Sequence, residues 1–241
     1  MPPAAESSAG TPRGRAAGRR AGLLLDIGGV VHRTGVHLVG RLADHEPAMK
    51  PVLERIGGVA GDRDELWQRM LRRQIGEREY WAQRAAELGA AVGETWDTRA
   101  LMDRFYQLPE HEWLCAPTIE LMTDAKAAGL RVGALTNDMT AFHGPEWVAR
   151  QAHLKLFDVI VDASLTGVMK PDPRAFRDGA EALGVPAGEI VFLDDMPWNV
   201  EGARQAGMTA IRVPWDDPVP AIDTARELLR LGPLTKEQAC R

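Results

Sequence analysis

Cysteine is scarce in this sequence, which has only Cys115 and Cys240 among its 241 residues. Two thiols so far apart in the chain give neither a disulfide framework nor the closely spaced ligands of a zinc site. Long apolar runs are also missing, since no stretch approaches the ~20 residues of a membrane-spanning helix. These absences predict a protein of a reducing compartment, with the cytoplasm as the default.

Basic residues are not in excess either: 29 lysines and arginines stand against 34 acidic residues, for a net charge of -5. Nucleic acids and anionic membranes are bound by concentrated basic faces, so neither is expected as the main partner. What the chain does have is a hydrophobic content of 45%, enough for a full core at this length. The composition predicts a globular protein with one large domain or a domain that carries an insertion.

Low complexity is confined to the start of the chain. Residues 1–20 are rich in Pro, Gly, Ala, Ser and Arg and show no apolar periodicity. Such a segment cannot bury enough apolar surface to offset the entropy lost on ordering, so a disordered tail is expected. The apolar run that follows is too short for an export signal.

That run, GLLLDIGGVV over residues 22–31, ends in a carboxylate and two glycines. A continuous apolar run suits a parallel strand that is covered on both faces, and ligands of such sheets bind beyond the carboxyl ends of the strands. Asp26 is therefore placed at the binding edge, where Gly28 and Gly29 let the backbone turn sharply and approach a ligand. The alternative is a buried strand that leaves through a solvated turn.

A helical part follows this strand. Between residues 32 and 115 apolar side chains recur at helical spacing, and consecutive helices on short connections favour a small antiparallel bundle. Its aromatic side chains either form the core of the bundle or line a pocket, and the core is expected for Trp67, Trp81 and Phe105. The helices are expected near 46–56, 66–71 and 78–88 and from about 97 onward.

After residue 115, helical patterns alternate with short apolar runs, which indicates a parallel sheet. The predicted fold is α/β: a doubly wound, parallel, five-stranded, Rossmann-like sheet with an all-helical insertion after its first strand. Its other strands are expected at 131–136, 157–161, 189–193 and 209–213. The expected divisions are a tail (1–20), a core domain (21–31 and 116–241) and a helical bundle (32–115).

Three further polar segments fall at the carboxyl edge of the predicted sheet. Thr136 and Asn137 end a strand and offer donors to an anion, a helix cap or turn being the alternative. Lys170 precedes two stiffening prolines in KPDP, where a solvated lysine is the alternative. Asp194 and Asp195 would repel each other unless a cation or hydrogen-bond donors satisfied them, which favours a metal site.

Together these segments resemble the motifs of the haloacid dehalogenase superfamily. LLLDIGGVV is similar to the first motif, ALTND to the second, KPDPRAF to the third and VFLDDMPWN to the fourth, in the order of the family. The resemblance extends from residue 22 to about 214, and the helical insertion resembles the cap of the family. The nearest branch is a phosphatase type that includes the phosphatase domain of epoxide hydrolases and small sugar-phosphate phosphatases.

The resemblance implies a phosphohydrolase of a small phosphorylated metabolite, in which Asp26 attacks phosphorus to form an aspartyl phosphate. It implies Mg²⁺ bound by Asp26, the backbone carbonyl of Gly28 and Asp195, with Asp194 acting through water. It also gives roles to three motif residues. Thr136 and Asn137 would bind phosphoryl oxygens, and Lys170 would stabilise charge on the nucleophile and the transferring group.

The chain departs from the family at Gly28, a DxG variant of the first motif. Phosphatases of the family generally have a second aspartate there, which protonates the leaving oxygen and then activates water, an effect worth roughly 10²–10⁴ in rate. Glycine can do neither, so a preference for weakly basic leaving groups is expected: acyl, aryl, anomeric or diphosphate. His32, His37 and Asp172 could replace the missing carboxyl, plain surface positions being the alternative.

Other functions stay open at this point. The chain could be a catalytically impaired relative that binds a phosphometabolite or a protein partner, with Gly28 as the mark of lost turnover. A dehalogenase shares the aspartate nucleophile but needs no metal, so Asp194 and Asp195 disfavour it. A phosphotransferase is a further alternative, because an aspartyl phosphate can pass to acceptors other than water. The oligomeric state is not indicated.

Overall fold

The structure is a computed structural model that describes residues 20–56 and 63–233. The disordered tail expected at residues 1–20 lies outside these ranges except for its last residue, Arg20. Cys240 also lies outside them. Within them, no helix has both the length and the apolar character that crossing a membrane requires.

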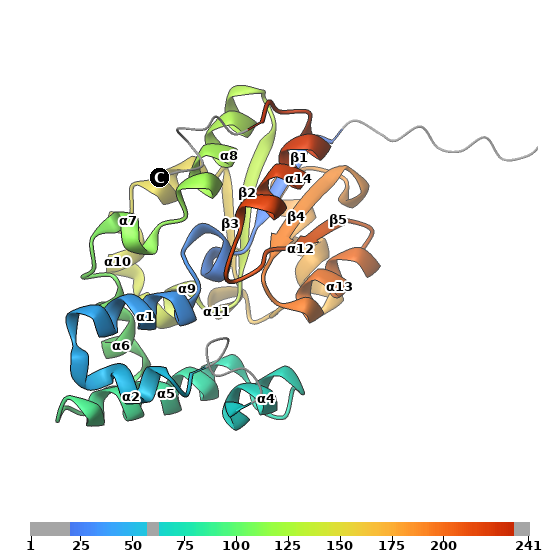
Figure 1. The fold of residues 1–241 in the computed structure, drawn as a ribbon. Coiled ribbons are helices and arrows are strands. Elements are labelled where there is room, and N and C mark those ends of the chain that lie inside the picture. Colours follow the sequence, from blue (N-terminus) through green and yellow to red (C-terminus); the bar gives the residue numbers. More distant parts are fainter. Residues whose placement is uncertain (1–19, 57–62, 234–241) are drawn as a thin grey trace, which may run out of the picture.

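A five-stranded parallel sheet forms the centre of the fold, with the strand order β3-β2-β1-β4-β5 (Figure 1). The first strand lies in the middle and pairs with β2 on one side and β4 on the other. The predicted sheet is confirmed, although its third strand begins at Val159 rather than at Phe157, which instead ends a helical turn over His153–Leu156. The strands are β1 (Gly22–Leu25), β2 (Arg131–Thr136), β3 (Val159–Asp162), β4 (Ile190–Asp194) and β5 (Thr209–Arg212).

Helices cover both faces of the sheet, so its central strand is fully buried. Leu23 and Leu25 pack with α8 (Ala116–Ala127) and α14 (Val219–Leu229) in one apolar cluster. Leu24 points to the opposite face and packs with α12 (Pro173–Leu183) and α13 (Pro197–Gln205). Because successive strand residues face opposite sides, burial on both sides explains why β1 is a continuous apolar run.

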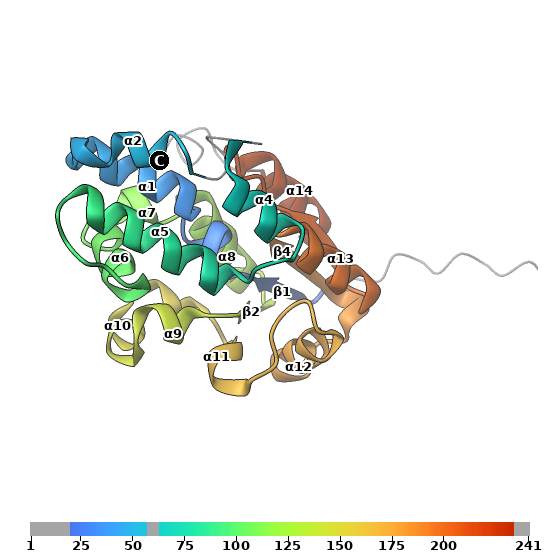
Figure 2. The ribbon, with the colours of Figure 1, turned by 90° about the horizontal axis from the view of Figure 1, so that it is seen from below.

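A separate helical layer lies beyond the carboxyl ends of the strands, between β1 and α8 in the chain (Figures 1 and 2). Its apolar side chains form a cluster of their own around Tyr80, Leu88 and Phe105, which is what an independent bundle requires. The division of the chain into a core domain and a bundle of residues 32–115 stays a prediction. The helices are α1 (Gly35–His45), α2 (Lys50–Leu53), α4 (Glu65–Leu71), α5 (Glu77–Ala91), α6 (Thr98–Phe105) and α7 (Glu110–Trp113).

The bundle differs from expectation at its start. Helix α1 was not predicted, although Thr34 caps it and accepts a hydrogen bond from the His37 N–H at 3.3 Å. The helix expected at 46–56 is instead a turn over Pro47–Met49 followed by the short α2. Pro47 and Pro51 each lack an N–H and suit only the first turn of a helix, so they divide the segment into two short helical pieces. Three short helices between strands were also missed: α9 (Met139–His143), α10 (Pro145–Arg150) and α11 (Ala163–Thr166).

Candidate active site

The register of the sheet brings the predicted motifs together. Leu25 of β1 pairs with Leu193 of β4, so the residues that follow them, Asp26 and Asp194, lie beside each other at the carboxyl edge. The backbone N–H of Asp26 continues this ladder by donating to the Leu193 carbonyl at 2.9 Å. Thr136 ends the neighbouring strand on the other side. The first, second and fourth motifs therefore meet because their strands are adjacent.

Lys170 joins this edge from the loop before α12. Its ammonium lies 3.0 Å from Asp26 Oδ1 and 2.6 Å from Asp194 Oδ2, and its side chain is 1% exposed. Burial alone would lower the pKa of Lys170, but the two carboxylates outweigh burial and raise that pKa above its usual value. The lysine is a buried cation between two carboxylates, and the alternative of a solvated lysine is wrong.

Asn137 fixes the backbone of this lysine. Its side-chain Oδ1 accepts from the Lys170 N–H at 2.8 Å, and its Nδ2 donates to the Lys170 carbonyl at 3.1 Å. The amide of Asn137 is thus engaged within the protein, which leaves the backbone N–H as the group of Asn137 predicted to bind phosphate. The sequence predicts polar residues at the end of this strand, but it does not reveal that Asn137 pairs with Lys170.

The neighbouring carboxylates Asp194 and Asp195 differ in burial and in their contacts. Asp194 is fully buried and accepts hydrogen bonds from the Met196 N–H at 2.9 Å and from the Asn199 amide at 3.1 and 3.2 Å, besides its contact with Lys170. Asp195 is half-buried and lines a pocket together with Asp26. Asp194 therefore braces the edge, and Asp195 faces the space above it.

The three carboxylates are crowded enough to hold a cation. Ligand atoms of Asp26, Asp194 and Asp195 all lie within 4.8 Å of one another. Burial raises the pKa of Asp26 to about 7, with Asp194 adding to the rise while Lys170 opposes it. Burial and the neighbouring carboxylates raise the pKa of Asp195 well above its usual value. Carboxylate oxygens are the ligands that Mg²⁺ prefers, so the residues present fit a divalent cation.

The glycines after Asp26 are not equivalent. Gly29 has φ +73°, and a Cβ there would collide with the Asp195 carboxylate. A Cβ at Gly28 would meet nothing within 4 Å, and its backbone, with φ -67° and ψ 134°, is open to any residue. Glycine is required at position 29 by close approach, whereas position 28 has open space for the Cβ of a side chain.

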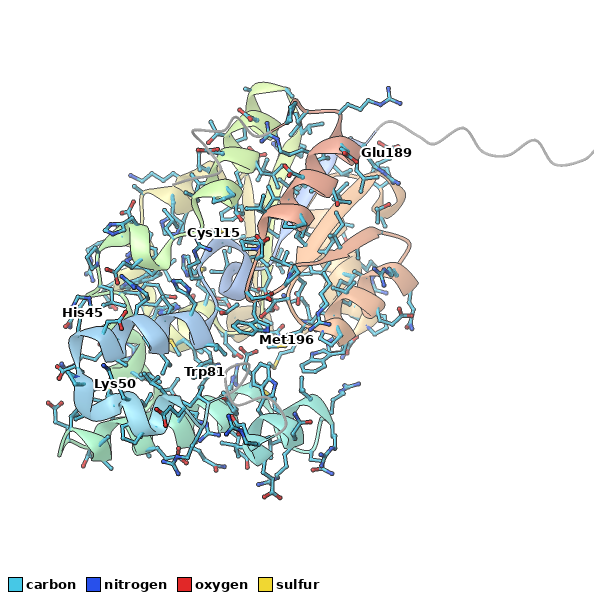
Figure 3. All side chains as sticks on the ribbon, in the orientation of Figure 1. His45, Lys50, Trp81, Cys115, Glu189 and Met196 are labelled. Carbon is cyan, nitrogen blue, oxygen red and sulfur yellow. The ribbon has the colours of Figure 1, made fainter. Side chains whose placement is uncertain are left out.

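The pocket over Asp26 lies between the sheet edge and the helical layer. Its floor includes Thr136 and Asp195, and its far wall includes Trp81 and Phe105 from the bundle. Trp81 and Met196 lie at the junction of the two layers in Figure 3, and Met196 packs against the apolar cluster of the bundle. Trp81 and Phe105 are buried in that cluster as predicted, and they line the pocket as well.

Two of the three residues named as replacements for the missing aspartate do not line this pocket. They are His37 and Asp172, and Asp172 instead caps α12 by accepting from the Arg174 N–H at 2.9 Å. His32 does line it, and the alternative of a surface position is wrong for this residue. Its ring is hydrogen-bonded to the Tyr106 hydroxyl at 3.0 Å and to His153 Nε2 at 2.9 Å. Burial holds the pKa of His32 well below its usual value, so its ring is neutral.

An acidic residue of the pocket was not predicted from the sequence. Glu77, the first residue of α5, lines the pocket together with Asp26. The next residue, Arg78, donates from Nε to Asp138 Oδ1 at 2.6 Å and so ties the start of α5 to the loop after β2. In the sequence, Glu77 looks like an ordinary acidic residue of a first helical turn, and no motif distinguishes it.

Comparison with known proteins decides the family. A family described as haloacid dehalogenase-like hydrolase matches residues 21–207. The chain belongs to the haloacid dehalogenase-like hydrolases. The family resemblance drawn from the four motifs is thereby confirmed.

Curated relatives in this family include different activities. The chain is 41% identical over 92 residues to Phosphatase MT3486 of Mycobacterium tuberculosis, covering 38% of this chain and 42% of that protein. It is 29% identical over 124 residues to a glyceraldehyde 3-phosphate phosphatase of Methanopyrus kandleri, covering 46% of this chain and 53% of that protein. It is 25% identical over 121 residues to (S)-2-haloacid dehalogenase 4A of Burkholderia cepacia, covering 48% of this chain and 50% of that protein. The matches thus span about half or less of these relatives.

Solved structures of the family share the fold. The HAD-hydrolase YfnB of Bacillus subtilis, described bound to magnesium, superposes with a TM-score of 0.59 at 16% identity, over 89% of this chain and 100% of that one. At this identity the likeness concerns the fold alone.

Proposed function

We propose that this haloacid dehalogenase-like hydrolase is a Mg²⁺-dependent phosphohydrolase of a small phosphorylated metabolite. The observation that carries the proposal is the buried ammonium of Lys170, held between Asp26 and Asp194 beside the free face of Asp195. This arrangement gives a carboxylate, Asp26, that can attack a substrate in the pocket, a fixed cation beside it and a set of oxygen ligands. The phosphatases among the relatives support the same reaction class.

The metal would be held by Asp26, Asp195 and the backbone carbonyl of Gly28. Asp194 would act one shell further out through water, which agrees with its burial and its three hydrogen-bond donors. When bound, a divalent cation there neutralises the charges of the phosphoryl group and the nucleophile, which would otherwise repel each other.

The residues of the chain then divide the reaction between them. Asp26 attacks phosphorus and forms an aspartyl phosphate, which water hydrolyses in a second displacement. The Thr136 hydroxyl and the backbone N–H of Asn137 bind the phosphoryl oxygens. Lys170 stabilises negative charge on Asp26 and on the transferring group, and its buried position makes this interaction strong. The bundle of residues 32–115 acts as a cap that excludes water from the pocket.

Dehalogenation and non-catalytic binding are the competing functions. Dehalogenases use the aspartate without a metal, so the crowding of Asp26, Asp194 and Asp195 favours phosphoryl transfer over dehalogenation. Non-catalytic binding would not need the Lys170 ammonium aimed at Asp26. Phosphotransfer to an acceptor other than water uses the same residues, and the products distinguish it from hydrolysis.

The test is phosphate release from a panel of aryl, alkyl, sugar and acyl phosphates and diphosphates, with Mg²⁺ or with EDTA. We expect release by the wild-type protein only with the metal, and its loss in Asp26→Asn, which keeps the size of the side chain. The exposed Asp103→Asn serves as the matched control and should behave as wild type. Phosphate release that survives in Asp26→Asn, or metal-free dehalogenation of a 2-haloacid, would overturn the proposal.

A further inference from the structure

We propose that Glu77 of the bundle is the catalytic proton-transfer carboxyl that this chain lacks at position 28. The inference rests on the proposed phosphohydrolase function and assigns a residue to a step that the four motifs leave without one. It places the general acid and base on the cap rather than on the loop after the nucleophile.

The position of Glu77 is fixed by its neighbours on α5. Arg78 pairs with Asp138 of the core and holds the first turn of the helix against the sheet edge. Trp81, one helical turn further on, lies close enough for its indole N–H to lower the pKa of the Glu77 carboxyl, against the larger effect of burial. Glu77 is thus held at the wall of the pocket that contains Asp26.

Elimination among the pocket carboxyls also leads to Glu77. Four carboxyl side chains line the pocket within the described part of the chain: Asp26, Glu77, Asp138 and Asp195. Asp26 and Asp195 belong to the nucleophile and metal set, and Asp138 is paired with Arg78. Burial, followed by the charge of Asp138, raises the pKa of Glu77 to about 7, so this carboxyl exchanges a proton near neutral pH.

The pocket histidines are less suited to this step. His32 is hydrogen-bonded to Tyr106 and His153, and burial lowers its pKa well below the usual value. His143 stacks on Trp147 with ring centroids 4.4 Å apart, and burial lowers its pKa to about 4. Both rings are neutral at pH 7, so neither offers the acidic proton of an imidazolium. The space over Gly28 is open, so a carboxyl from the cap has room to act there.

Protons and bonds balance over two displacements. Asp26 forms a bond to phosphorus while the bond from phosphorus to the leaving oxygen breaks, and the Glu77 carboxyl gives its proton to that oxygen. The leaving alcohol departs and Glu77 is left as a carboxylate. In the second step Glu77 takes a proton from water as the water oxygen bonds to phosphorus. The aspartyl–phosphorus bond then breaks, which releases inorganic phosphate and restores both side chains.

The test compares Glu77→Gln with wild type on an aryl phosphate, 4-nitrophenyl phosphate, and on a primary alkyl phosphate, glycerol 3-phosphate. Glutamine keeps the size of the side chain and an oxygen that can accept a hydrogen bond, but it cannot give or take the proton. We expect kcat on the alkyl phosphate to fall by roughly 10²–10³, because the leaving alkoxide needs a proton. With the aryl phosphate the first step should continue, and acid-quenched protein should contain an accumulated aspartyl phosphate. Glu79→Gln, an exposed position on the same helix, should match wild type in both measurements.

A second variant restores the carboxyl at the position used by the family. On glycerol 3-phosphate, the double variant Gly28→Asp with Glu77→Gln should have a kcat at least tenfold higher than that of Glu77→Gln alone, because position 28 has room for a side chain. Equal activity of Glu77→Gln and wild type on both substrates would overturn the assignment while leaving the phosphohydrolase intact. Equal losses on both substrates, with no accumulated phosphoenzyme and no recovery in the double variant, would also overturn it. Failure of the proposed function itself shows separately, as the absence of phosphate release in wild type.

Discussion

Asn137 and Lys170 are joined by two hydrogen bonds, one from the Lys170 N–H to the Asn137 amide oxygen at 2.8 Å and one from the amide nitrogen to the Lys170 carbonyl at 3.1 Å. The pair links the loop after β2 to the loop before α12. Its effect is to fix the backbone from which the lysine reaches Asp26 and Asp194. In the proposed reaction, an amide at a strand end would therefore act on catalysis through another residue.

Replacement of Asn137 by alanine should loosen the lysine without removing its charge. We expect the free energy of unfolding to fall by about 1–3 kcal/mol, the cost of leaving buried backbone groups unpaired. The rate of phosphate release should fall more than tenfold, with little change in magnesium affinity. Urea unfolding and kinetics measure the two effects. The exposed Gln205→Ala, which loses one surface hydrogen bond to Glu201, is the control and should change stability by less than about 0.5 kcal/mol.

Gly28 and Gly29 make a matched pair for a test of the metal site. Gly29→Ala forces a side chain into the left-handed region, at a cost of roughly 1–2 kcal/mol, and drives its Cβ into the Asp195 carboxylate. We expect lower stability and at least tenfold weaker Mg²⁺ binding, measured by calorimetry. Gly28→Ala fills open space and should change neither quantity appreciably. Equal effects of the two substitutions would contradict the close approach of the Asp195 carboxylate to Gly29.

The sheet could be predicted from the sequence because its strands are buried on both faces and therefore appear as short apolar runs. The motifs could be placed because every parallel strand ends at the same edge, so Asp26, Thr136 and Asp194 had to lie close together. Lys170 followed from the family motif that contains it. These predictions used local patterns and one rule of topology.

What escaped prediction depends on contacts between distant segments. Helix α1 follows the first motif, and its apolar residues were not recognised as a helical face. The partners of the Asn137 amide and of the His32 ring come from other loops and helices, and so do the burial and neighbours of Glu77. No spacing within one segment encodes such neighbours, because they are set by how the bundle lies on the sheet.

Lys170→Met should show how strongly the buried ammonium stabilises the fold. The variant leaves Asp194 fully buried without its cation, and breaking a buried pair costs about 3–5 kcal/mol. The pKa of Asp26 should rise further because the lysine no longer lowers it. A carboxyl whose folded pKa is raised loses stability as pH rises, so the deficit should be larger at pH 8 than at pH 5.5. Urea unfolding at both pH values measures it, and Asp194→Asn in the same background should recover part of the loss.

His143 provides a test of acid sensitivity. Burial lowers its pKa from 6.5 to about 4, so the unfolded chain binds a proton between these values that the folded chain does not. Stability from this group is therefore fully present above pH 6.5 and is lost as pH falls toward 4, by about 2 kcal/mol at pH 5.

His143→Phe keeps an aromatic ring over Trp147 and removes the titration of the imidazole. The pKa values of Asp26 and Glu77 are raised, so these two groups change the stability with pH in the opposite direction. The effect of His143 is therefore measured as the difference in unfolding free energy between wild type and variant, once at pH 7.5 and once at pH 5. We expect this difference to move in favour of the variant by about 2 kcal/mol on acidification. A pH-independent difference for His143→Phe would contradict the burial of that ring.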